Sequence, residues 1–356
     1  MKIRHVITTI ERGGAENQLL ILAKNQVRNG HQVTVSYLKG IPELKVAFES
    51  VGIIVDNNLQ KMNFFQQLFF QKKFADDLLH LHLPRSELVF AFRNSKIITI
   101  STRHNSEKFF KKFTLISSML SRFATRRISK VIAISESVKK FLIENDEIKD
   151  KNKIELIYYG ISPEMINKNV KEKGSSFSLQ KKIIIGSVAR LTAQKDLDTV
   201  IRALSILKEK EIEVKCEVIG SGEDHAYLLD LSRQLDVQNE VVFLGRRDNP
   251  WIEAQKWDQF VLSSKYEGFG LVLLEAMKYS LPIVASKIDT CIEILGRDYP
   301  FFFEPSQPAS LAKKIIEIAN VDFDYKSLYL SKLKEFSDLK QIILHEKLYK
   351  NVCSPK

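Results

Sequence analysis

The sequence has no run of eighteen apolar residues, no Cys-x-x-Cys pair and only three cysteines. A helix that crosses a bilayer needs about 20 mostly apolar residues, so we expect no membrane-spanning segment. The first ten residues lack the apolar stretch and the small-residue cleavage site of a signal peptide. Cys216, Cys291 and Cys353 are odd in number and far apart, which argues against a disulfide framework or a zinc site and suggests a reducing compartment. We therefore expect a cytoplasmic protein.

Two further absences limit the chemistry. The glycines near the N-terminus are adjacent, Gly13-Gly14, and do not form the Gly-x-Gly-x-x-Gly pattern of a nicotinamide site. No Asp-x-Asp pair stands at the end of a predicted strand, so we expect neither a cofactor nor a metal ion. What remains is a globular composition, with 356 residues, 44% hydrophobic and 27% charged. This length suits two domains of about 150–180 residues.

The net charge of +11 is concentrated in the first half of the chain. Residues 1–165 carry 26 Lys or Arg against 16 Asp or Glu, whereas residues 166–356 carry 28 against 27. The excess peaks in a segment without acids, whose seven cations are Lys108, Lys111, Lys112, Arg122, Arg126, Arg127 and Lys130. Nucleic acid is one possible partner, but no recognised nucleic-acid motif accompanies these cations. An anionic membrane fits better, because each cation near such a surface contributes roughly 1 kcal/mol.

Strands and helices are predicted to alternate along both halves of the chain. The first half has predicted strands at His5–Ile10, Gln32–Leu38, Ile53–Asn57, Lys96–Ser101, Val131–Ile134 and Ile154–Tyr158, with a long helical region at Asn63–Leu83. Ser135 is placed to cap the helix that follows the fifth of these strands. The second half has predicted strands at Ile183–Ser187, Val214–Ile219, Val241–Leu244, Phe260–Leu262 and Pro282–Ser286. Such alternation indicates an α/β fold with two doubly wound, Rossmann-like parallel sheets.

The stretch Ser263–Met277 predicts an anion site. Apolar residues before it form a buried strand, and Leu271–Tyr279 favours a helix. Gly268 and Gly270 let the chain turn tightly and let a ligand approach the backbone. The N-terminus of a helix entered in this way presents free N–H groups and a positive dipole end to a phosphate.

Two glutamates flank this anion site, Glu267 before the turn and Glu275 eight residues later. Carboxylates repel phosphate, so we expect them to accept hydrogen bonds from hydroxyl groups on either side of it. A phosphate flanked by hydroxyl-bearing groups describes a sugar nucleotide. The alternative is an ordinary β-loop-α unit with two solvated glutamates.

Five segments, in this order, resemble those of the retaining, nucleotide-sugar-dependent glycosyltransferases of family 4, also called glycosyl transferases group 1. They are Gly13-Gly14-Ala15-Glu16, Thr102-Arg103-His104-Asn105, Ile132-Ala133-Ile134-Ser135-Glu136-Ser137, Gly186-Ser187-Val188-Ala189-Arg190 with Lys195, and Glu267-Gly268-Phe269-Gly270 with Glu275. The resemblance covers nearly the whole chain and implies the GT-B fold, in which two Rossmann-like domains face each other across a cleft. It implies an N-terminal, acceptor-binding domain at residues 1–165, a linker at 166–182, a donor-binding domain at 183–330, and a C-terminal helix at 331–356 that returns to the first domain.

The resemblance also implies a role for each matching residue. Arg190 and Lys195 neutralise the donor diphosphate, Glu275 binds the ribose hydroxyls, Glu267 binds the transferred sugar, and His104 reaches that sugar from the other domain. Glu267, His104, Arg190 and Lys195 are therefore the implied catalytic residues. The remaining implied donor-site residues are Gly13, Gly14, Ser187, Gly245, Arg246, Gly268, Phe269, Gly270, Leu271 and Val272.

The chain departs from the family pattern at two places. Tyr158-Tyr159-Gly160 stands where the family usually has Asn before Gly, and residues 287–293 lack the usual glycines and Pro-Glu pair. The second departure leaves the identity of the donor sugar open.

The activity implied is transfer of a sugar from a nucleoside diphosphate, expected to be UDP, to an acceptor hydroxyl with retention of configuration. The acceptor is expected to be a glycan, lipid-linked, in the biosynthesis of cell-surface polysaccharide. A sugar-nucleotide epimerase or hydrolase of the same fold is one alternative, and a basic nucleic-acid-binding protein is another.

The basic segment contains one apolar helix face, formed by Phe109, Phe113, Ile116, Leu120 and Phe123. This face either packs into the core of the first domain or remains on the surface and docks on anionic lipid. The second possibility predicts a peripheral protein on the inner face of the plasma membrane.

Overall fold

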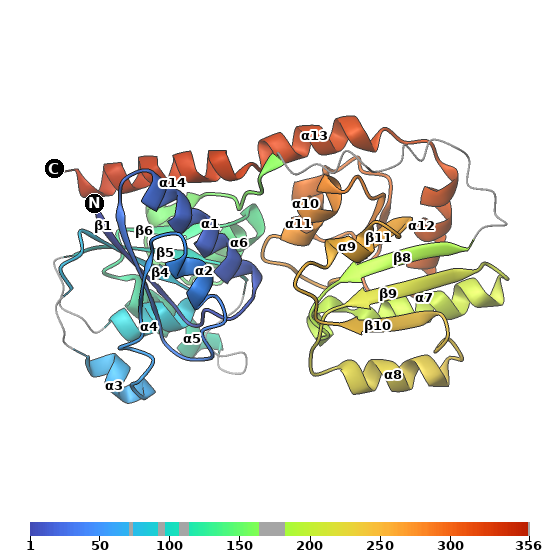
Figure 1. Ribbon diagram of the computed structural model, residues 1–356, viewed down its shortest axis with the longest axis horizontal. Coiled ribbons are helices and arrows are strands. Elements are labelled where there is room, and N and C mark those ends of the chain that lie inside the picture. The colour runs from blue at the N-terminus through green and yellow to red at the C-terminus, as the bar shows by residue number, and fades with distance from the viewer. Residues whose placement is uncertain (71–73, 92–96, 107–113, 164–181, 355–356) are drawn as a thin grey trace. The chain divides into compact units, whose positions relative to one another are not determined.

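The computed structural model describes residues 1–70, 74–91, 97–106, 114–163 and 182–354 (Figure 1). The chain divides into two units, the first comprising residues 1–160 and 336–356 and the second residues 161–335. Among the described helices, none is both long enough and apolar enough to pass through a bilayer.

The first unit is built on a seven-stranded parallel sheet with the order β3-β2-β1-β4-β5-β6-β7. Its strands are β1 (Lys2–Ile7), β2 (Gln32–Tyr37), β3 (Ile54–Asp56), β4 (Leu78–His82), β5 (Ile98–Arg103), β6 (Lys130–Ala133) and β7 (Ile154–Leu156). The chain winds outward from β1 in one direction and from β4 in the other, so the order of strands reverses between them. His5 of β1 lies opposite His80 of β4 at this point.

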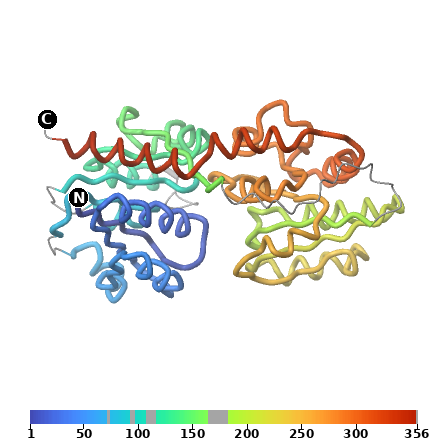
Figure 2. Tube along the Cα trace, turned by 45° about the horizontal axis from the view of Figure 1, so that its top comes forward, coloured from blue at the N-terminus to red at the C-terminus, as the bar shows by residue number. Residues whose placement is uncertain are grey.

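The helices of the first unit are α1 (Gly14–Arg28), α2 (Lys45–Glu49), α3 (Phe64–Phe69), α4 (Pro84–Ala91), α5 (Thr114–Thr125), α6 (Glu136–Glu144) and α14 (Asp338–Cys353), with a short 3-10 turn at Lys151–Lys153. Right-handed crossovers on either side of the reversal place α1 and α4 on opposite faces of the sheet. The C-terminal α14 packs against α1 and runs along the first unit, as the red trace in Figure 2 shows. Ser135 caps α6 as predicted, because its Oγ accepts a hydrogen bond from the Val138 amide at 3.0 Å.

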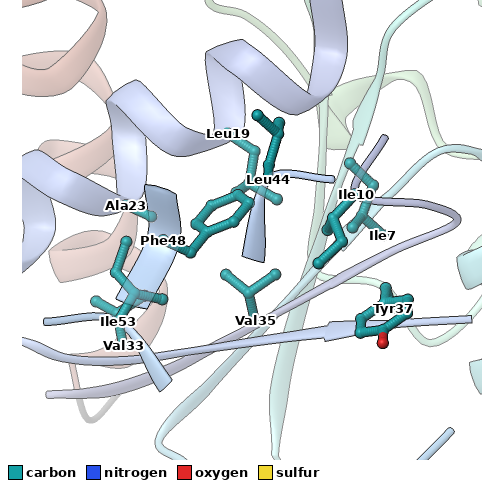
Figure 3. Packing of buried hydrophobic residues seen from close by; sticks show 10 residues of the cluster. All are labelled: Ile7, Ile10, Leu19, Ala23, Val33, Val35, Tyr37, Leu44, Phe48 and Ile53. Atoms are coloured by element: carbon teal, nitrogen blue, oxygen red, sulfur yellow. The ribbon is translucent and has the colours of Figure 1, made fainter. Parts of the chain in front are cut away.

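A hydrophobic cluster fills the space between β1, β2, α1 and α2 (Figure 3). Alternate residues of β2, Val33, Val35 and Tyr37, point into it, as the period of a strand requires. Phe48 of α2 is fully buried among them. Burial of such a side chain stabilises a fold by about 1.5–3 kcal/mol.

The helical region predicted for Asn63–Leu83 is wrong in its second half. A helix does begin after Asn63, whose side chain forms a capping box with Gln66, but α3 ends at Phe69. Residues Leu78–His82 form β4, which pairs with β1 and β5, and all five are buried. Leucine favours helices in isolation, but pairing with β1 and β5 on either side overrides that preference in β4.

The second unit contains a six-stranded parallel sheet with the order β10-β9-β8-β11-β12-β13. Its strands are β8 (Ile183–Val188), β9 (Val214–Ile219), β10 (Val241–Gly245), β11 (Gln259–Leu262), β12 (Ile283–Ser286) and β13 (Phe302–Phe303). Its helices are α7 (Leu197–Glu209), α8 (His225–Gln234), α9 (Trp251–Ala254), α10 (Leu271–Lys278), α11 (Asp289–Leu295), α12 (Pro308–Asn320) and α13 (Tyr325–Glu335), with a 3-10 turn at Ala193–Lys195. The order of strands reverses between β8 and β11.

The division of the chain differs in detail from the predicted boundaries. The first unit ends at Gly160 and not at residue 165, and α13 belongs to the second unit, which extends to Glu335 and not to residue 330. The returning segment therefore begins at Phe336. Of the predicted linker, residues 166–181 lie outside the described part of the chain.

Gly160, the last residue of the range 1–160 in the first unit, allows the start of α14 to approach closely. Its amide donates to Gln341 Oε1 at 3.0 Å, and its carbonyl accepts from Gln18 Nε2 at 3.0 Å. A Cβ atom at this position would lie 2.4 Å from the backbone of Ser337 and Asp338.

We predict that Gly160→Ala lowers the free energy of unfolding by about 1–3 kcal/mol, the usual cost of overpacking. Urea titration of the full chain measures this, and Ser354→Ala, at the exposed end of α14, should change it by less than about 0.5 kcal/mol. Equal stability of Gly160→Ala and wild type would contradict the close approach.

Candidate active site

The N-terminus of α10 is the centre of the candidate site in the second unit. Gly270 precedes the helix with φ of +84°, a left-handed conformation that glycine adopts at little cost. The amides of Leu271 and Val272 lie in the first turn of the helix and have no acceptor within it. They lie beyond the carboxyl end of β11, next to the reversal of strand order, where open α/β sheets bind ligands.

Glu267 and Lys195, both predicted site residues, are in direct contact. Lys195 Nζ lies 2.5 Å from Glu267 Oε1, and Ser264 Oγ donates to the same oxygen at 2.6 Å. The Glu267 carbonyl accepts from Thr290 Oγ1 at 3.0 Å. Both side chains of the ion pair are largely buried, with 14% of Lys195 and 8% of Glu267 exposed. The pair thus joins the loop after β8 to the loop after β11 and places a cation beside the α10 N-terminus.

The backbone on either side of Arg190 is held by hydrogen bonds to the end of β9 and the loop that follows it. Leu191 N donates to the Ser221 carbonyl, and Ala189 N donates to the Ile219 carbonyl, both at 3.0 Å. A Cβ atom on Gly220 would lie 1.9 Å from the Ala189 carbonyl oxygen, so only glycine permits this approach. The arrangement leaves the Arg190 side chain exposed at the carboxyl edge of the sheet.

Glu275 lies in the second turn of α10 and contacts Trp251. Trp251 Nε1 donates to Glu275 Oε2 at 3.2 Å, and the Trp251 ring stacks on Tyr279 with centroids 5.4 Å apart. Burial raises the pKa of Glu275 from 4.5 to about 7, although the Trp251 hydrogen bond and Lys278 act in the opposite direction. No local sequence pattern points to Trp251, which comes close to Glu275 only through the fold.

The other predicted donor-site residues of the second unit lie at the same edge of the sheet. Ser187 is buried near the end of β8, and Gly245, with φ of +69°, ends β10. Arg246 follows it and is exposed. In the first unit, Gly13 precedes α1 in an extended conformation and Gly14 is the first residue of that helix. The proximity of these first-unit residues to the donor site stays a prediction.

His104 is part of a hydrogen-bonded chain of histidines in the first unit. His5 Nδ1 lies 2.9 Å from His82 Nε2, and His82 Nδ1 lies 3.1 Å from His104 Nε2. His104 Nδ1 contacts the Tyr159 hydroxyl, and His5 Nε2 lies 2.7 Å from Gln26 Oε1. Both ring nitrogens of His104 are therefore engaged within the first unit.

Two more histidines extend this layer beneath α14. His80 Nδ1 lies 2.7 Å from the Tyr349 hydroxyl, which accepts from Gln26 Nε2 at 3.1 Å, and His80 Nε2 lies 2.7 Å from Thr102 Oγ1. His345 donates from Nδ1 to the Gln341 carbonyl at 2.9 Å. Five of the seven histidines of the sequence thus meet in one buried layer.

Burial disfavours the charged form of all five histidines. It lowers the pKa of His5 and His345 to about 4 and that of His104 to about 3. The pKa values of His80 and His82 are also well below the usual range, because burial and the neighbouring histidines both oppose protonation. The layer is consequently neutral at pH 7.

Ligand nitrogens of His5, His80 and His82 lie within 4.8 Å of one another, a spacing that could hold a metal ion. Every ring nitrogen of these three residues, however, already has a protein hydrogen-bond partner. The cluster is complete as a hydrogen-bonded network.

Comparison with known proteins identifies the family. Residues 12–165 match the family described as Glycosyltransferase Family 4, and residues 169–328 match the one described as Glycosyl transferases group 1. The chain belongs to the group 1, family 4 glycosyltransferases.

The relatives of this glycosyltransferase extend over most of its length. It is 28% identical over 347 residues to an uncharacterized glycosyltransferase of Methanocaldococcus jannaschii, with 88% of this chain and 87% of the relative covered. It is 24% identical over 309 residues to the O-antigen biosynthesis glycosyltransferase WclY of Escherichia coli, with 83% of each covered. Its fold is similar to that of Anabaena HepE in complex with UDP-glucose, with a TM-score of 0.79, 20% identity, and 99% and 100% of the two chains covered. The predicted GT-B fold with two Rossmann-like units is confirmed.

Glu275 should make the stability of the second unit depend on pH. Because its folded-state pKa of about 7 exceeds the unfolded value of 4.5, the folded state holds a proton in this range that the unfolded state has lost. The free energy of unfolding should therefore fall as the pH rises from about 5 to about 7, and Glu275→Gln should remove that fall. Both tryptophans of the sequence, Trp251 and Trp257, lie in this unit, so urea titration followed by tryptophan emission reports on it. The same pH dependence in the variant would show that Glu275 is not the group responsible.

Proposed function

We propose that the enzyme transfers a sugar from a UDP-sugar to a glycan hydroxyl with retention of configuration. The observation that carries this proposal is the α10 N-terminus, with the Lys195–Glu267 pair before it and Glu275 within it. A diphosphate over the Leu271 and Val272 amides would have a carboxylate on each side for its hydroxyl-bearing groups. The UDP-glucose bound in the structure of Anabaena HepE supports this type of donor.

In the proposed reaction, the chain supplies positive charge to the departing diphosphate. As the bond to the sugar stretches, negative charge grows on the phosphate. Lys195, Arg190 and the α10 amides would stabilise this charge. The helix dipole contributes about 0.3–2 kcal/mol, whereas removal of one preorganised donor commonly lowers kcat by about 10²–10³. The two cations should therefore contribute most. In this reaction the departing phosphate would take the proton of an acceptor hydroxyl that attacks from the same face.

The Lys195–Glu267 pair gives each residue a defined task in this reaction. Without substrate, Glu267 holds Lys195 at 2.5 Å. A sugar hydroxyl that donates to Glu267 would lie beside the same lysine. The ion pair would then contact the sugar through Glu267 and the diphosphate through Lys195.

We predict that substitution of Glu275 and of Glu267 affects different steps, the first UDP binding and the second turnover. Glu275→Ala should weaken the binding of free UDP by tenfold or more, because a hydrogen bond to a charged group contributes about 1.5–3 kcal/mol. Glu267→Ala should leave UDP binding within about twofold and lower kcat by about 10²–10³. Calorimetry with UDP and initial rates with a panel of UDP-sugars measure both. UDP affinity lost in Glu267→Ala and kept in Glu275→Ala would reverse the assignments, and donor consumed equally with and without an acceptor would indicate a hydrolase or epimerase.

We further propose that the acceptor is lipid-linked and that α5 brings the first unit to an anionic membrane. The face of α5 turned to the protein is small and polar, with Ser117, Ser121 and Thr125 buried. Its opposite face is apolar and open, with Ile116 53% and Met119 64% exposed. This amphipathicity is the reverse of that of an ordinary surface helix.

The buried Arg103 explains why α5 turns its polar face inward. The Arg103 guanidinium binds both carboxylate oxygens of Glu87, at 2.7 and 2.5 Å, and donates to Ser121 Oγ at 2.9 Å. All three side chains are fully buried. A large apolar residue in place of Ser121 would leave part of the guanidinium without a partner, which is costly.

Other exposed apolar side chains and cations accompany the open face of α5. Phe65 and Phe69 of α3 are 72% and 69% exposed, and α4 packs against both α3 and α5. Arg126 and Arg127 follow α5 and are exposed. Arg122 pairs with Asp146, and Lys130 pairs with Glu155. Of the other predicted residues of this surface, Phe123 is 39% exposed and Leu120 is partly buried. Lys108, Phe109, Lys111, Lys112 and Phe113 lie outside the described part of the chain.

Membrane binding through α5 is tested by sedimentation with vesicles. We expect the full chain to sediment with anionic vesicles at low salt and to be released by high salt, because the attraction is screened. Met119→Asp should weaken this sedimentation, whereas Leu339→Asp, at an equally exposed apolar position of α14, should not. Recovery of the wild type in the supernatant with anionic and neutral vesicles at both salt concentrations would refute the proposal.

A further inference from the structure

We propose that Gln26, His5 and His82 are positioning residues that hold His104 neutral and in one tautomer, and that a substrate hydroxyl replaces Tyr159 on His104 Nδ1. The proposal rests on the glycosyl transfer proposed above and identifies the interaction through which the first unit would contact a sugar.

A single amide sets the direction of the whole hydrogen-bonded chain. The Gln26 carbonyl oxygen can only accept, so His5 must donate to it from Nε2. His5 Nδ1 then accepts from His82 Nε2, and His82 Nδ1 accepts from His104 Nε2. With the amide in this orientation, His104 carries its proton on Nε2, and its Nδ1 accepts from the Tyr159 hydroxyl.

The same amide also sets the second branch. Gln26 Nε2 donates to the Tyr349 hydroxyl, which donates to His80 Nδ1, so that His80 donates from Nε2 to Thr102. A reversed amide would reverse every hydrogen bond in both branches. The tautomers of His5, His82 and His104 are therefore locked together and cannot change one at a time.

The surroundings keep the chain uncharged. Among the residues that the structure describes, no carboxylate accepts a hydrogen bond from a ring nitrogen of His5, His80, His82 or His104. The helices packed against the layer carry three acids, which are Glu16 of α1, accepting from Thr9 Oγ1 at 2.9 Å, Glu346 of α14, pairing with His31 at 3.0 Å, and Asp338 at the start of α14. The other groups that face the layer, Gln18, Gln341, His345 and Tyr349, are neutral.

A neutral chain without a carboxylate cannot store a proton taken from a substrate. An imidazolium at any position would be buried without a counter-charge, which is unfavourable. His104 therefore serves as an oriented hydrogen-bonding group and not as a general base.

Tyr159 occupies the end of this chain that a substrate could use. It stands at a position where the family usually has asparagine, and its hydroxyl contacts His104 Nδ1. A cavity of about 10 Å³ adjoins both residues, next to Gln18, whose buried Oε1 has no hydrogen-bond partner. This space is on the order of one water molecule, so a sugar hydroxyl could enter only as the tyrosine moves aside.

Nitrogen-15 NMR of the imidazole rings in the full chain tests the lock directly. We expect neutral rings at pH 7 in the wild type, with His104 in one tautomer. In Gln26→Glu, the carboxylate beside His5 should produce an imidazolium at pH 7, and kcat should gain an ionisation near neutral pH that the wild type lacks. Gln26→Met, which removes the hydrogen bonds without adding charge, should give mixed tautomers and no new ionisation. A role limited to stability would leave the pH profile unchanged in all three proteins.

Tyr159→Phe tests the exchange of hydroxyls. Loss of the competing hydroxyl should lower KM for the sugar substrate by about 2–10-fold, the value of one net hydrogen bond, with little change in kcat. An unchanged or raised KM would overturn the exchange. Three results would overturn the lock. The first is an imidazolium signal in the wild type, and the second is a wild-type spectrum in Gln26→Glu. The third is one equivalent of bound metal whose removal also removes the His5–His80–His82 hydrogen bonds. Because the NMR does not depend on turnover, an intact pattern without sugar transfer would contradict the proposed function instead.

Discussion

Parallel pairing of every strand with its neighbour determines where each unit can bind a ligand. The carboxyl ends of parallel strands meet at one edge of the sheet, and a gap opens where the strand order reverses. In the second unit the reversal lies between β8 and β11, and the loops after these strands carry Lys195 and Glu267. In the first unit it lies between β1 and β4, and Gly13-Gly14 come in the loop after β1. The predicted functional residues of both units therefore gather at one kind of position in the fold.

Both faces of the first sheet bury polar groups where apolar packing is usual. Adjacent residues of β5 point to opposite faces, so Thr102 joins the histidine layer under α14 while Arg103 joins Glu87 and Ser121 under α4 and α5. Buried polar groups stabilise only when their hydrogen bonds are complete, and they then restrict the packing to one arrangement. The histidine layer thereby fixes how α14 docks, and the arginine layer fixes the orientation of α5.

The strand, turn and helix around Glu267 were predicted correctly because these residues lie in one short segment, whereas the donor-binding roles of its residues stay a prediction. Glu267, the glycines and Glu275 fall within nine residues, and local rules for a strand, a turn and a helix place them correctly. The histidine layer was not predicted, because its members are separated by up to 340 residues, from His5 to His345. The error at β4 also concealed it, since His80 and His82 share a face only when the segment is a strand. The apolar face of α5 was predicted, but its exposure depends on Arg103, whose burial no local pattern indicates.

We propose that the second unit recognises a nucleoside diphosphate by cations and helix amides and needs no metal ion to do so. Calorimetry with UDP and with uridine, each in the presence of a chelator, tests it most directly. We expect UDP to bind in the presence of the chelator and uridine to bind far more weakly. We expect Lys195→Ala to lower the affinity for UDP nearly to that for uridine. Binding of UDP that disappears in the chelator and returns with a divalent ion, or equal affinity for UDP and uridine, would contradict the account.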